Sequence, residues 1–322
     1  MRRAFFAACV SSLLATAPAV RGDEATGATA PAAGSSAPAD AASTTLATFK
    51  TSYAVDASSR PRAFNVELAA SAIDGKTLAP GATLSFNDAV GERTSAFGFA
   101  RAAVIRDRMM AEGTGGGACQ VASTLHAAAL LAGLDVVARA PHSRPSAYIR
   151  MGLDATVSFA SIDLQVKNPR AEAVRVRAKA RGGTLEVSLE SKGTRPAVTI
   201  TSEIVERMPF TRTVERSDAV RDGVVQVVAY GIPGYRVRRV RELTLGGATR
   251  RDRRDDTYAP TPEIVRVSPS FDMARLTKGT PLASDGAEPR ELRPLVWDTA
   301  SAARPALVQV RPSARVVLSN TP

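Results

Sequence analysis

Apolar residues near the start of the folded part of the chain recur at two spacings, which predict a strand and then a helix. The strand is predicted where the pattern has a period of two, at Phe49, Thr51, Tyr53 and Val55. The helix is predicted where the spacing is helical, at Phe64, Leu68 and Ala72. Pro61 suits the first turn of this helix, and Gly75 supplies a left-handed residue at its end.

A second helix is predicted after a run of glycines. The short apolar runs Thr83–Phe86 and Ala102–Ile105 are predicted strands, and the glycines between 113 and 117 are predicted to break regular structure. The helix then runs from Cys119 to Ala132, with one apolar face and with Gly133 at its end. A strand over Asp135–Arg139 is predicted to return along it.

The rest of the chain has the pattern of a β protein. Residues 174–190 alternate on both sides of a glycine turn and predict a hairpin with opposite charges on its solvent face. Further strands are predicted between 193 and 267, including Val224–Val228 and Tyr235–Val240. Arg250–Asp256 carries both signs of charge and is predicted to be a solvated turn. In the tail, which holds Trp297, the segments Leu307–Val310 and Val316–Leu318 are candidates for an added edge strand.

These elements predict an α+β fold in which a cysteine-bearing helix packs on an antiparallel sheet, followed by a small all-β domain. Residues 1–22 have the two arginines, the short apolar run and the small residues of a secretory signal peptide. Residues 23–46 are nearly all Ala, Ser, Thr, Gly and Pro, which predicts a disordered linker. We therefore expect a main domain over 47–192, a small all-β domain over 193–268 and a partly disordered tail over 269–322. The mature protein is expected to be exported and to have no transmembrane span.

The chain is basic, with a formal net charge of +11 that comes mostly from arginine. The basic residues are scattered and no groove-reading or base-stacking motif accompanies them, which argues against nucleic acid as a partner. A basic surface on an exported protein favours an anionic cell-envelope polymer as partner. An arginine-rich composition that reflects a genome rich in guanine and cytosine explains the charge equally well.

The chain has two cysteines, Cys9 and Cys119, and Cys9 is predicted to leave with the signal peptide. Cys119 is then an unpaired thiol at the start of the predicted helix. The free amides and the positive end of the helix dipole stabilise a thiolate there and lower the thiol pKa from its reference of about 8.5. Those amides also suit a developing oxyanion, and we expect the preceding glycines to leave room for a substrate.

His142 is the histidine best placed to act as a base for this thiol. His126 is seven residues along the same helix from Cys119, a rise of about 10 Å, which is too far for a hydrogen bond. We expect His126 to be a wall position or a satisfied buried histidine. A cysteine-bearing helix followed by a histidine-bearing strand is the papain and transglutaminase layout. Asp154 is the predicted orienting acid, Asp163 is the second choice, and Asp135 has no assigned role.

The residues from about Phe49 to Asn168 resemble the VanW-like family, which is named for an accessory gene of glycopeptide (vancomycin) resistance clusters. The matching blocks occur in order, at Arg62, Asn65, Pro80-Gly81, Ser85-Phe86-Asn87, Gly91, Arg93-Thr94, Gly115 to Gly117, Cys119-Gln120-Val121, Ser123-Thr124-Leu125, His142-Ser143, Gly152, Asp154-Ala155-Thr156 and Asp163-Leu164. The chain departs from the family's usual residues at Ala118 and His126. The resemblance implies a role at the cell wall.

The smaller domain resembles, over a short stretch, the glycine-named β domain that often follows VanW-like domains. The resemblance is carried by Gly231 to Tyr235 and by Tyr258 to Pro262. It implies an association with cell-wall polymers.

Two classes of function remain open at this point. In the first, Cys119 attacks an amide or ester carbonyl of peptidoglycan or a related envelope polymer, as in a transpeptidase, amidase or transglutaminase, His142 moves the proton and Asp154 orients His142. In the second, the glycine loop and helix start bind a wall polymer without catalysis, and Cys119 is structural. The residues expected to contact the ligand are Gly115, Gly116, Gly117, Gln120, Ser123 and Ser143. No cofactor is predicted. A zinc site made by the same three residues ranks last, because close ligand pairs are missing.

Overall fold

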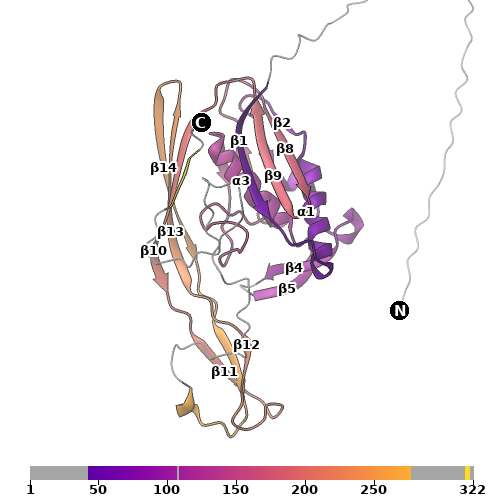
Figure 1. The fold of residues 1–322 in the computed structure, drawn as a ribbon, viewed down its shortest axis with the longest axis vertical. Helices are drawn as coiled ribbons and strands as arrows, with labels where there is room; N and C mark the ends of the chain where they lie inside the picture. The colour runs from indigo at the N-terminus through magenta and orange to yellow at the C-terminus, as the bar shows by residue number, and fades with distance from the viewer. Residues whose placement is uncertain (1–42, 107–108, 277–315, 320–322) are drawn as a thin grey trace, which may run out of the picture. The chain divides into compact units, whose positions relative to one another are not determined.

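Strands from the two ends of the first predicted domain lie side by side in one antiparallel sheet (Figure 1). The computed structural model describes residues 43–106, 109–276 and 316–319. In this sheet the order is β1-β9-β8-β2, formed by Thr44–Ser52, Thr184–Ser191, Val174–Arg181 and Thr77–Leu78. The predicted signal peptide with Cys9, most of the predicted linker, Trp297 and Leu307–Val310 lie outside the described residues.

The hairpin predicted over 174–190 is confirmed as β8 and β9, with left-handed glycines at Gly182 and Gly183. Its solvent face carries paired charges, including Arg177 with Glu190 at 3.2 Å. The predicted boundary between linker and domain at residue 46 is wrong by a few residues. The strand β1 begins at Thr44, because Leu46 is fully buried and extends the pairing with β9.

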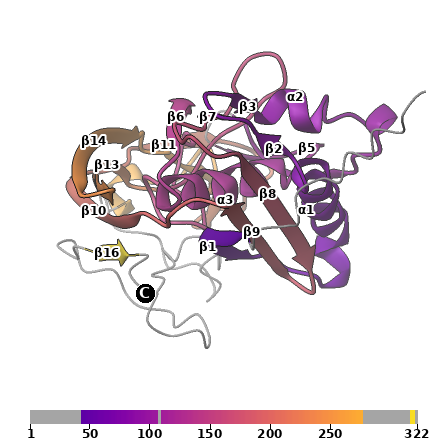
Figure 2. The same cartoon turned by 90° about the horizontal axis from the view of Figure 1, so that it is seen from above.

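Two helices lie next to each other against this sheet, as the view from above shows (Figure 2). The helix α1 spans Arg60–Ile73 and contacts β8, and α3 spans Ala118–Leu131 and contacts β1 and β9. The predicted helix is confirmed as α1, but the apolar spacing that predicted it is not that of its buried face. Phe64 is 51% exposed, and the buried residues are Ala63, Asn65, Val66, Ala69, Ala70 and Ile73.

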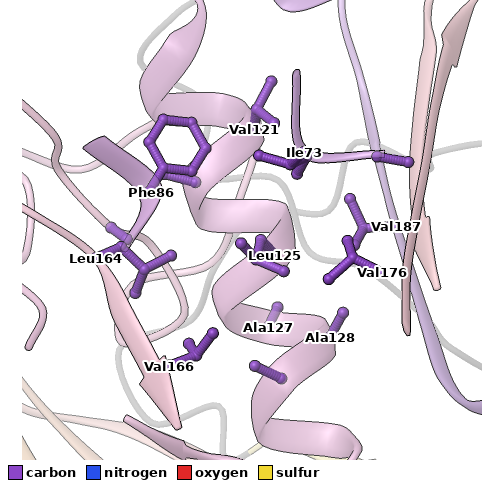
Figure 3. Close-up of a cluster of buried hydrophobic side chains, with 14 of the residues drawn as sticks. Ile73, Phe86, Val121, Leu125, Ala127, Ala128, Leu164, Val166, Val176 and Val187 are labelled. Atoms are coloured by element: carbon purple, nitrogen blue, oxygen red, sulfur yellow. The ribbon is translucent and has the colours of Figure 1, made fainter. Parts of the chain in front are cut away.

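Every residue of α3 except Cys119 is buried. Figure 3 shows the reason: Phe86, Leu164 and Val166 lie on one side of the helix, and Ile73, Val176 and Val187 lie on the other. A helix covered all round needs apolar or small residues on all its faces, and α3 is built from alanine, leucine and valine with a few satisfied polar residues. The helix therefore forms the centre of the core, and its one accessible side chain is the cysteine.

A second, smaller antiparallel sheet covers the other side of α3. Its order is β3-β7-β6, formed by Thr83–Ser85, Gln165–Lys167 and Asp135–Ala138. The short helix α2 (Phe86–Val90) follows β3 directly, so Phe86 is not the end of a strand as predicted. The reason is a cap: the Ser85 hydroxyl accepts the Asp88 amide at 3.0 Å.

The connection before α3 is a hairpin of β4 (Arg101–Arg106) and β5 (Met109–Thr114). The predicted break over 113–117 is therefore wrong for Gly113 and Thr114, which pair with Ala102 and Arg101. Short 3₁₀ turns complete the described chain, at Ala57–Ser59, Ser95–Phe97 and Met273–Arg275.

The C-terminal strands form two further sheets. The first has the order β14-β13-β10-β16, from Ala248–Tyr258, Gly234–Leu245, Ala197–Met208 and Val316–Ser319. The second has the order β11-β15-β12, from Arg212–Arg216, Glu263–Val267 and Val225–Ala229, and β11 runs parallel to β15. The predicted edge strand over Val316–Leu318 is confirmed as β16.

The predicted turn over Arg250–Asp256 is wrong, although most of these residues are solvent-accessible as expected. These residues form most of β14 and pair with β13 along its whole length. Asp256 is 4% exposed and bonds to Arg139 of the first domain. The Arg241 guanidinium on β13 likewise donates to the Leu134 carbonyl at 2.8 Å, just after the end of α3. The C-terminal strands thus contact the core helix and the segment that follows it through buried polar groups.

The burial pattern of α1 makes a stability prediction. Ile73→Ala should lower the free energy of unfolding by about 2–5 kcal/mol, because it opens a cavity in the core beneath β8. Phe64→Ala, on the exposed face of the same helix, should change it by about 0.5 kcal/mol or less. Urea denaturation of both variants measures the difference. A larger loss for Phe64→Ala would contradict the assignment of the faces.

Candidate functional site

Cys119 is the second residue of α3 and is half-buried. Gly117 precedes the helix with a φ of 117°, a conformation that favours glycine. The sulfur lies 3.5 Å from both the amide nitrogen and the carbonyl oxygen of Val157. The thiol is therefore held between the helix start and the chain around Val157.

The glycines before Cys119 pack closely against neighbouring parts of the protein. A Cβ on Gly115 would lie 2.5 Å from the Arg93 Cβ, and one on Gly116 would lie 2.4 Å from the Ala103 carbonyl oxygen. A Cβ on Gly117 would lie 2.9 Å from a Val66 methyl. The space that glycine leaves is thus already filled by the protein.

His142 and Asp154 are both buried and are joined twice. The Nδ1 of His142 lies 2.8 Å from the Asp154 Oδ2, and the His142 backbone amide donates to the same oxygen at 2.7 Å. Burial by itself raises the pKa of Asp154, but the hydrogen bonds and charge of His142, together with Arg139, lower it well below its ordinary range. Asp154 is therefore ionised beside the imidazole.

His142 and Cys119 also act on each other's ionisation. Since Asp154 occupies Nδ1, the nitrogen left for the thiol is Nε2, which also lies 3.2 Å from the Tyr148 hydroxyl. Burial lowers the pKa of His142, but Tyr148, Asp154 and Cys119 raise it well above its ordinary value. Burial raises the pKa of the Cys119 thiol, but His142, Val157 and Arg93 lower it below its ordinary value. Both shifts favour a thiolate–imidazolium pair.

Sequence reasoning missed the groups that hold the second oxygen of Asp154. The Arg139 Nη2 donates to Oδ1 at 2.9 Å, and the Tyr258 hydroxyl donates to the same oxygen at 2.5 Å. The Tyr258 oxygen in turn accepts the Gly152 amide at 2.7 Å, and Tyr258 is fully buried. Tyr258 belongs to β14, about a hundred residues away in sequence, so no local signal connects it to Asp154.

A buried ion pair supports Arg139 from the same strand. Its Nη1 donates to the Asp256 Oδ1 at 2.5 Å, and its Nε donates to the Asp154 backbone carbonyl at 2.6 Å. Arg254 adds a bond to Asp256 at 3.2 Å and a bond to the Arg139 carbonyl at 2.9 Å. The strand β14 thus holds both Asp154 and the arginine that pairs with it.

The other acids and the second histidine have structural contacts. His126 is fully buried, with Nδ1 2.7 Å from the Leu153 carbonyl. Burial, reinforced by Arg139 and Arg239, lowers its pKa well below the ordinary value, so it stays neutral. Asp163, the second choice for the orienting acid, accepts the Asn87 amide at 2.9 Å and the Ser85 hydroxyl at 2.6 Å at the start of α2. Asp135 pairs with Arg250 on β14.

Two of the polar residues predicted to contact a ligand are bonded inside the fold. Gln120 and Ser123 are fully buried. The Gln120 side chain bonds to Thr51, to the Ser52 carbonyl and to Arg62. The Ser123 hydroxyl bonds to backbone groups of Cys119 and Ala155. Ser143 is exposed beside His142 and is the predicted contact that solvent reaches most freely.

Comparison with known proteins places the first domain in a family. Residues 61–190 match the family described as VanW like protein. This part of the chain is a VanW-like domain. An uncharacterised protein of Bacillus subtilis (strain 168), YoaR, is 40% identical over 136 residues, which cover 42% of this chain and 45% of that protein. The match therefore spans less than half of that relative.

A solved structure, titled IgA1 Protease G5 domain structure, is similar to a smaller part of the chain. It is 23% identical, covers 23% of this chain and 93% of its own length, and has a TM-score of 0.17, which is too low to establish a common fold. In the described part of the chain, no helix is long and apolar enough to cross a membrane. Within the same residues, no three His, Cys, Asp or Glu side chains are grouped to hold a metal ion.

The contact between Tyr258 and Asp154 predicts a stability effect. Tyr258→Phe should lower the free energy of unfolding by about 1–3 kcal/mol, because it removes a donor from a buried carboxylate and the acceptor of the Gly152 amide. Tyr235→Phe is the matched control, since Tyr235 faces Tyr258 across the β13–β14 ladder. Urea denaturation measures both, and equal losses would contradict a specific role of the Tyr258 hydroxyl.

Proposed function

We propose that this VanW-like protein is an exported cell-envelope enzyme that uses Cys119 as a nucleophile for acyl transfer or amide hydrolysis. The observation that carries the proposal is the 2.8 Å hydrogen bond between His142 and Asp154 next to Cys119, whose thiol and the imidazole shift each other's pKa. A nucleophile next to a base, with the base bonded to an orienting acid, is the arrangement that covalent catalysis requires.

The electrostatics of the three residues support the same function. A lowered thiol pKa and a raised imidazole pKa favour the negative charge on sulfur and the proton on nitrogen. Asp154 stabilises the imidazolium and fixes its orientation through two bonds to one oxygen. The pair is then ready to attack without a prior proton transfer.

The reaction follows from this charge distribution. The thiolate attacks a carbonyl carbon, a carbon–sulfur bond forms, and the electron pair of the carbonyl moves to oxygen. When the tetrahedral intermediate collapses, the carbon–nitrogen bond breaks and His142 gives its proton to the leaving amine. Water or an acceptor amine then attacks the thioester, with neutral His142 taking up its proton, and the thiolate is restored.

The amides of Ala118 and Gln120 at the helix start are not free to stabilise the oxyanion. The Ala118 and Gln120 amides donate to the carbonyls of Gly115 and Gly117, at 3.2 and 2.9 Å. The Tyr148 hydroxyl, next to Nε2 of His142, is the side-chain donor that we assign to this task.

The position of the cysteine in the fold supports this reaction class. A cysteine at the start of a buried helix, packed on an antiparallel sheet and followed by a histidine-bearing segment, is the papain and transglutaminase arrangement. The resemblance to the VanW-like family and the predicted signal peptide favour an envelope substrate. We therefore propose peptidoglycan stem peptides, or a related wall polymer with amide or ester bonds, as the substrate class.

The pH dependence of thiol alkylation tests the proposal directly. In the full chain carrying Cys9→Ser, Cys119 is the single thiol. Its reaction with iodoacetamide should reach half its maximal rate below pH 8.5, because a lowered pKa keeps the thiolate present at lower pH. His142→Ala should move this midpoint to about 8.5 or higher, because burial then acts without the imidazole.

His126→Gln is the control for this experiment and should leave the midpoint in place, since His126 is neutral and bonded elsewhere. A midpoint near 8.5 that His142→Ala does not change would contradict the proposal and favour a structural cysteine in a wall-binding protein. With purified muropeptides, the same His142→Ala change should lower the turnover rate by about 10²–10⁴-fold, and Cys119→Ala should abolish turnover.

A further inference from the structure

Two arginines beside the cysteine have no carboxylate within ion-pairing distance in the described part of the chain. Arg62 donates to the Gln120 side-chain oxygen at 2.8 Å. Arg93 donates to the Asn87 side-chain oxygen at 2.7 Å and to the Gly91 carbonyl at 3.0 Å. All three acceptors are neutral. The third arginine of the site, Arg139, is by contrast paired with two carboxylates.

Arg93 lies close to the nucleophile. Its side chain packs on Gly115, four residues before Cys119, and its charge acts on the thiol. Its guanidinium carbon lies 5.8 Å from the centre of the Phe159 ring, two residues after the Val157 groups that contact the sulfur. The Nη2 of Arg93 is buried and has no hydrogen-bond acceptor. A buried guanidinium nitrogen without an acceptor is costly, and an anionic ligand would satisfy it.

Arg62 lies close to the base. Its guanidinium carbon lies 5.7 Å from the centre of the Tyr148 ring, and the Tyr148 hydroxyl lies 3.2 Å from Nε2 of His142. The bond from Arg62 to Gln120 also ties it to the residue after Cys119. Each arginine therefore covers an aromatic ring that borders the Cys119–His142 pair.

Solvent reaches this group of side chains. Cys119, Arg62, Arg93 and Tyr148 are each half-buried, and Phe159 is 45% exposed. Asp163 acts on Arg93 through space, but its oxygens are bonded to Ser85 and to the Asn87 amide. In the described residues neither Arg62 nor Arg93 is paired with a carboxylate, so each guanidinium keeps its positive charge for an incoming anion.

We propose that Arg62 and Arg93 form a subsite for an anionic group, so that Cys119 acts on substrates that carry a carboxylate next to the scissile carbonyl. Arginine suits this role because its planar donors match a carboxylate and its stacking on an aromatic ring limits its freedom. The inference rests on the proposed function, of which it names the substrate class.

The test compares two alkylating reagents that differ in charge and share a leaving group, iodoacetate and iodoacetamide. In the Cys9→Ser chain, the ratio of their rates at one pH cancels the fraction of thiolate. Arg93→Gln and Arg62→Gln should each lower the ratio of iodoacetate to iodoacetamide by about 3–10-fold, because each removes an attraction for the anionic reagent. Arg60→Gln is the matched control: Arg60 is exposed at the start of α1 and should leave the ratio unchanged.

A measurement that needs no arginine substitution tests the subsite even if the arginine variants fail to fold. Raising the salt concentration should lower the ratio for the Cys9→Ser chain, because salt screens the attraction of the partly exposed arginines. Arg93→Lys and Arg62→Lys, which keep the charge, should retain most of the ratio. A ratio that is insensitive to salt and to both glutamine variants would overturn the subsite, and so would an equal fall in Arg60→Gln.

The result for the anionic subsite can be distinguished from the result for the proposed catalysis. If the arginine variants lower the ratio while His142→Ala leaves the iodoacetamide profile unchanged, the anionic subsite stands and acyl transfer fails. If His142→Ala shifts the profile while the ratio ignores both arginines, the subsite fails and the catalytic proposal stands.

Discussion

The buried carboxylate of Asp154 organises the site and connects the two predicted domains. A charge in the interior is tolerated when its oxygens are paired and hydrogen-bonded, and both oxygens of Asp154 are occupied. One accepts from the His142 amide and ring, and the other accepts from Arg139 and Tyr258. These partners come from three parts of the chain, so the position of His142 depends on all of them. Loss of any one would leave a buried charge partly unpaired.

Buried polar groups join the first domain to the C-terminal strands. Arg239 and Arg241 on β13 are almost fully buried, and Arg241 donates to a backbone carbonyl just after α3. Burial lowers the pKa of Arg239 to about 10, which keeps it protonated at neutral pH. Together with the Arg139–Asp256 pair, these groups make the C-terminal sheet a structural part of the candidate site. Through Tyr258 the C-terminal sheet binds Asp154 directly, so it does more than space the first domain from the wall.

The core helix decides where chemistry is accessible. Because α3 is covered by sheets on two sides, its polar residues are satisfied inside the fold and its cysteine alone reaches a half-exposed position. Two arginines near that position, Arg62 and Arg93, each lie over an aromatic ring, Tyr148 and Phe159, and come from separate segments of the chain.

The sequence by itself determined the elements whose signals are local. The glycine at the end of α3 and the alternation of β8 and β9 are readable over a few residues, because caps and periods act at short range. The resemblance of the VanW-like blocks rests on the same local evidence. Phe64 shows the limit: helical spacing identified α1, but which of its faces is buried depends on the sheet that packs against it.

Only the tertiary structure decided which groups complete the site. Asp154 is held by Arg139 and by Tyr258, and Arg139 is held in turn by Asp256. In the last two of these contacts the partners are more than a hundred positions apart in the sequence. The mixed charges of Arg250–Asp256 look alike in a solvated turn and in a strand that buries Asp256 against Arg139, since composition does not reveal what lies opposite a strand. The glycines before Cys119 likewise suggested an open cradle, and the side chains of Arg93 and Val66 fill it. Burial and pairing are properties of the folded chain, and they determine which of the polar residues are available for chemistry.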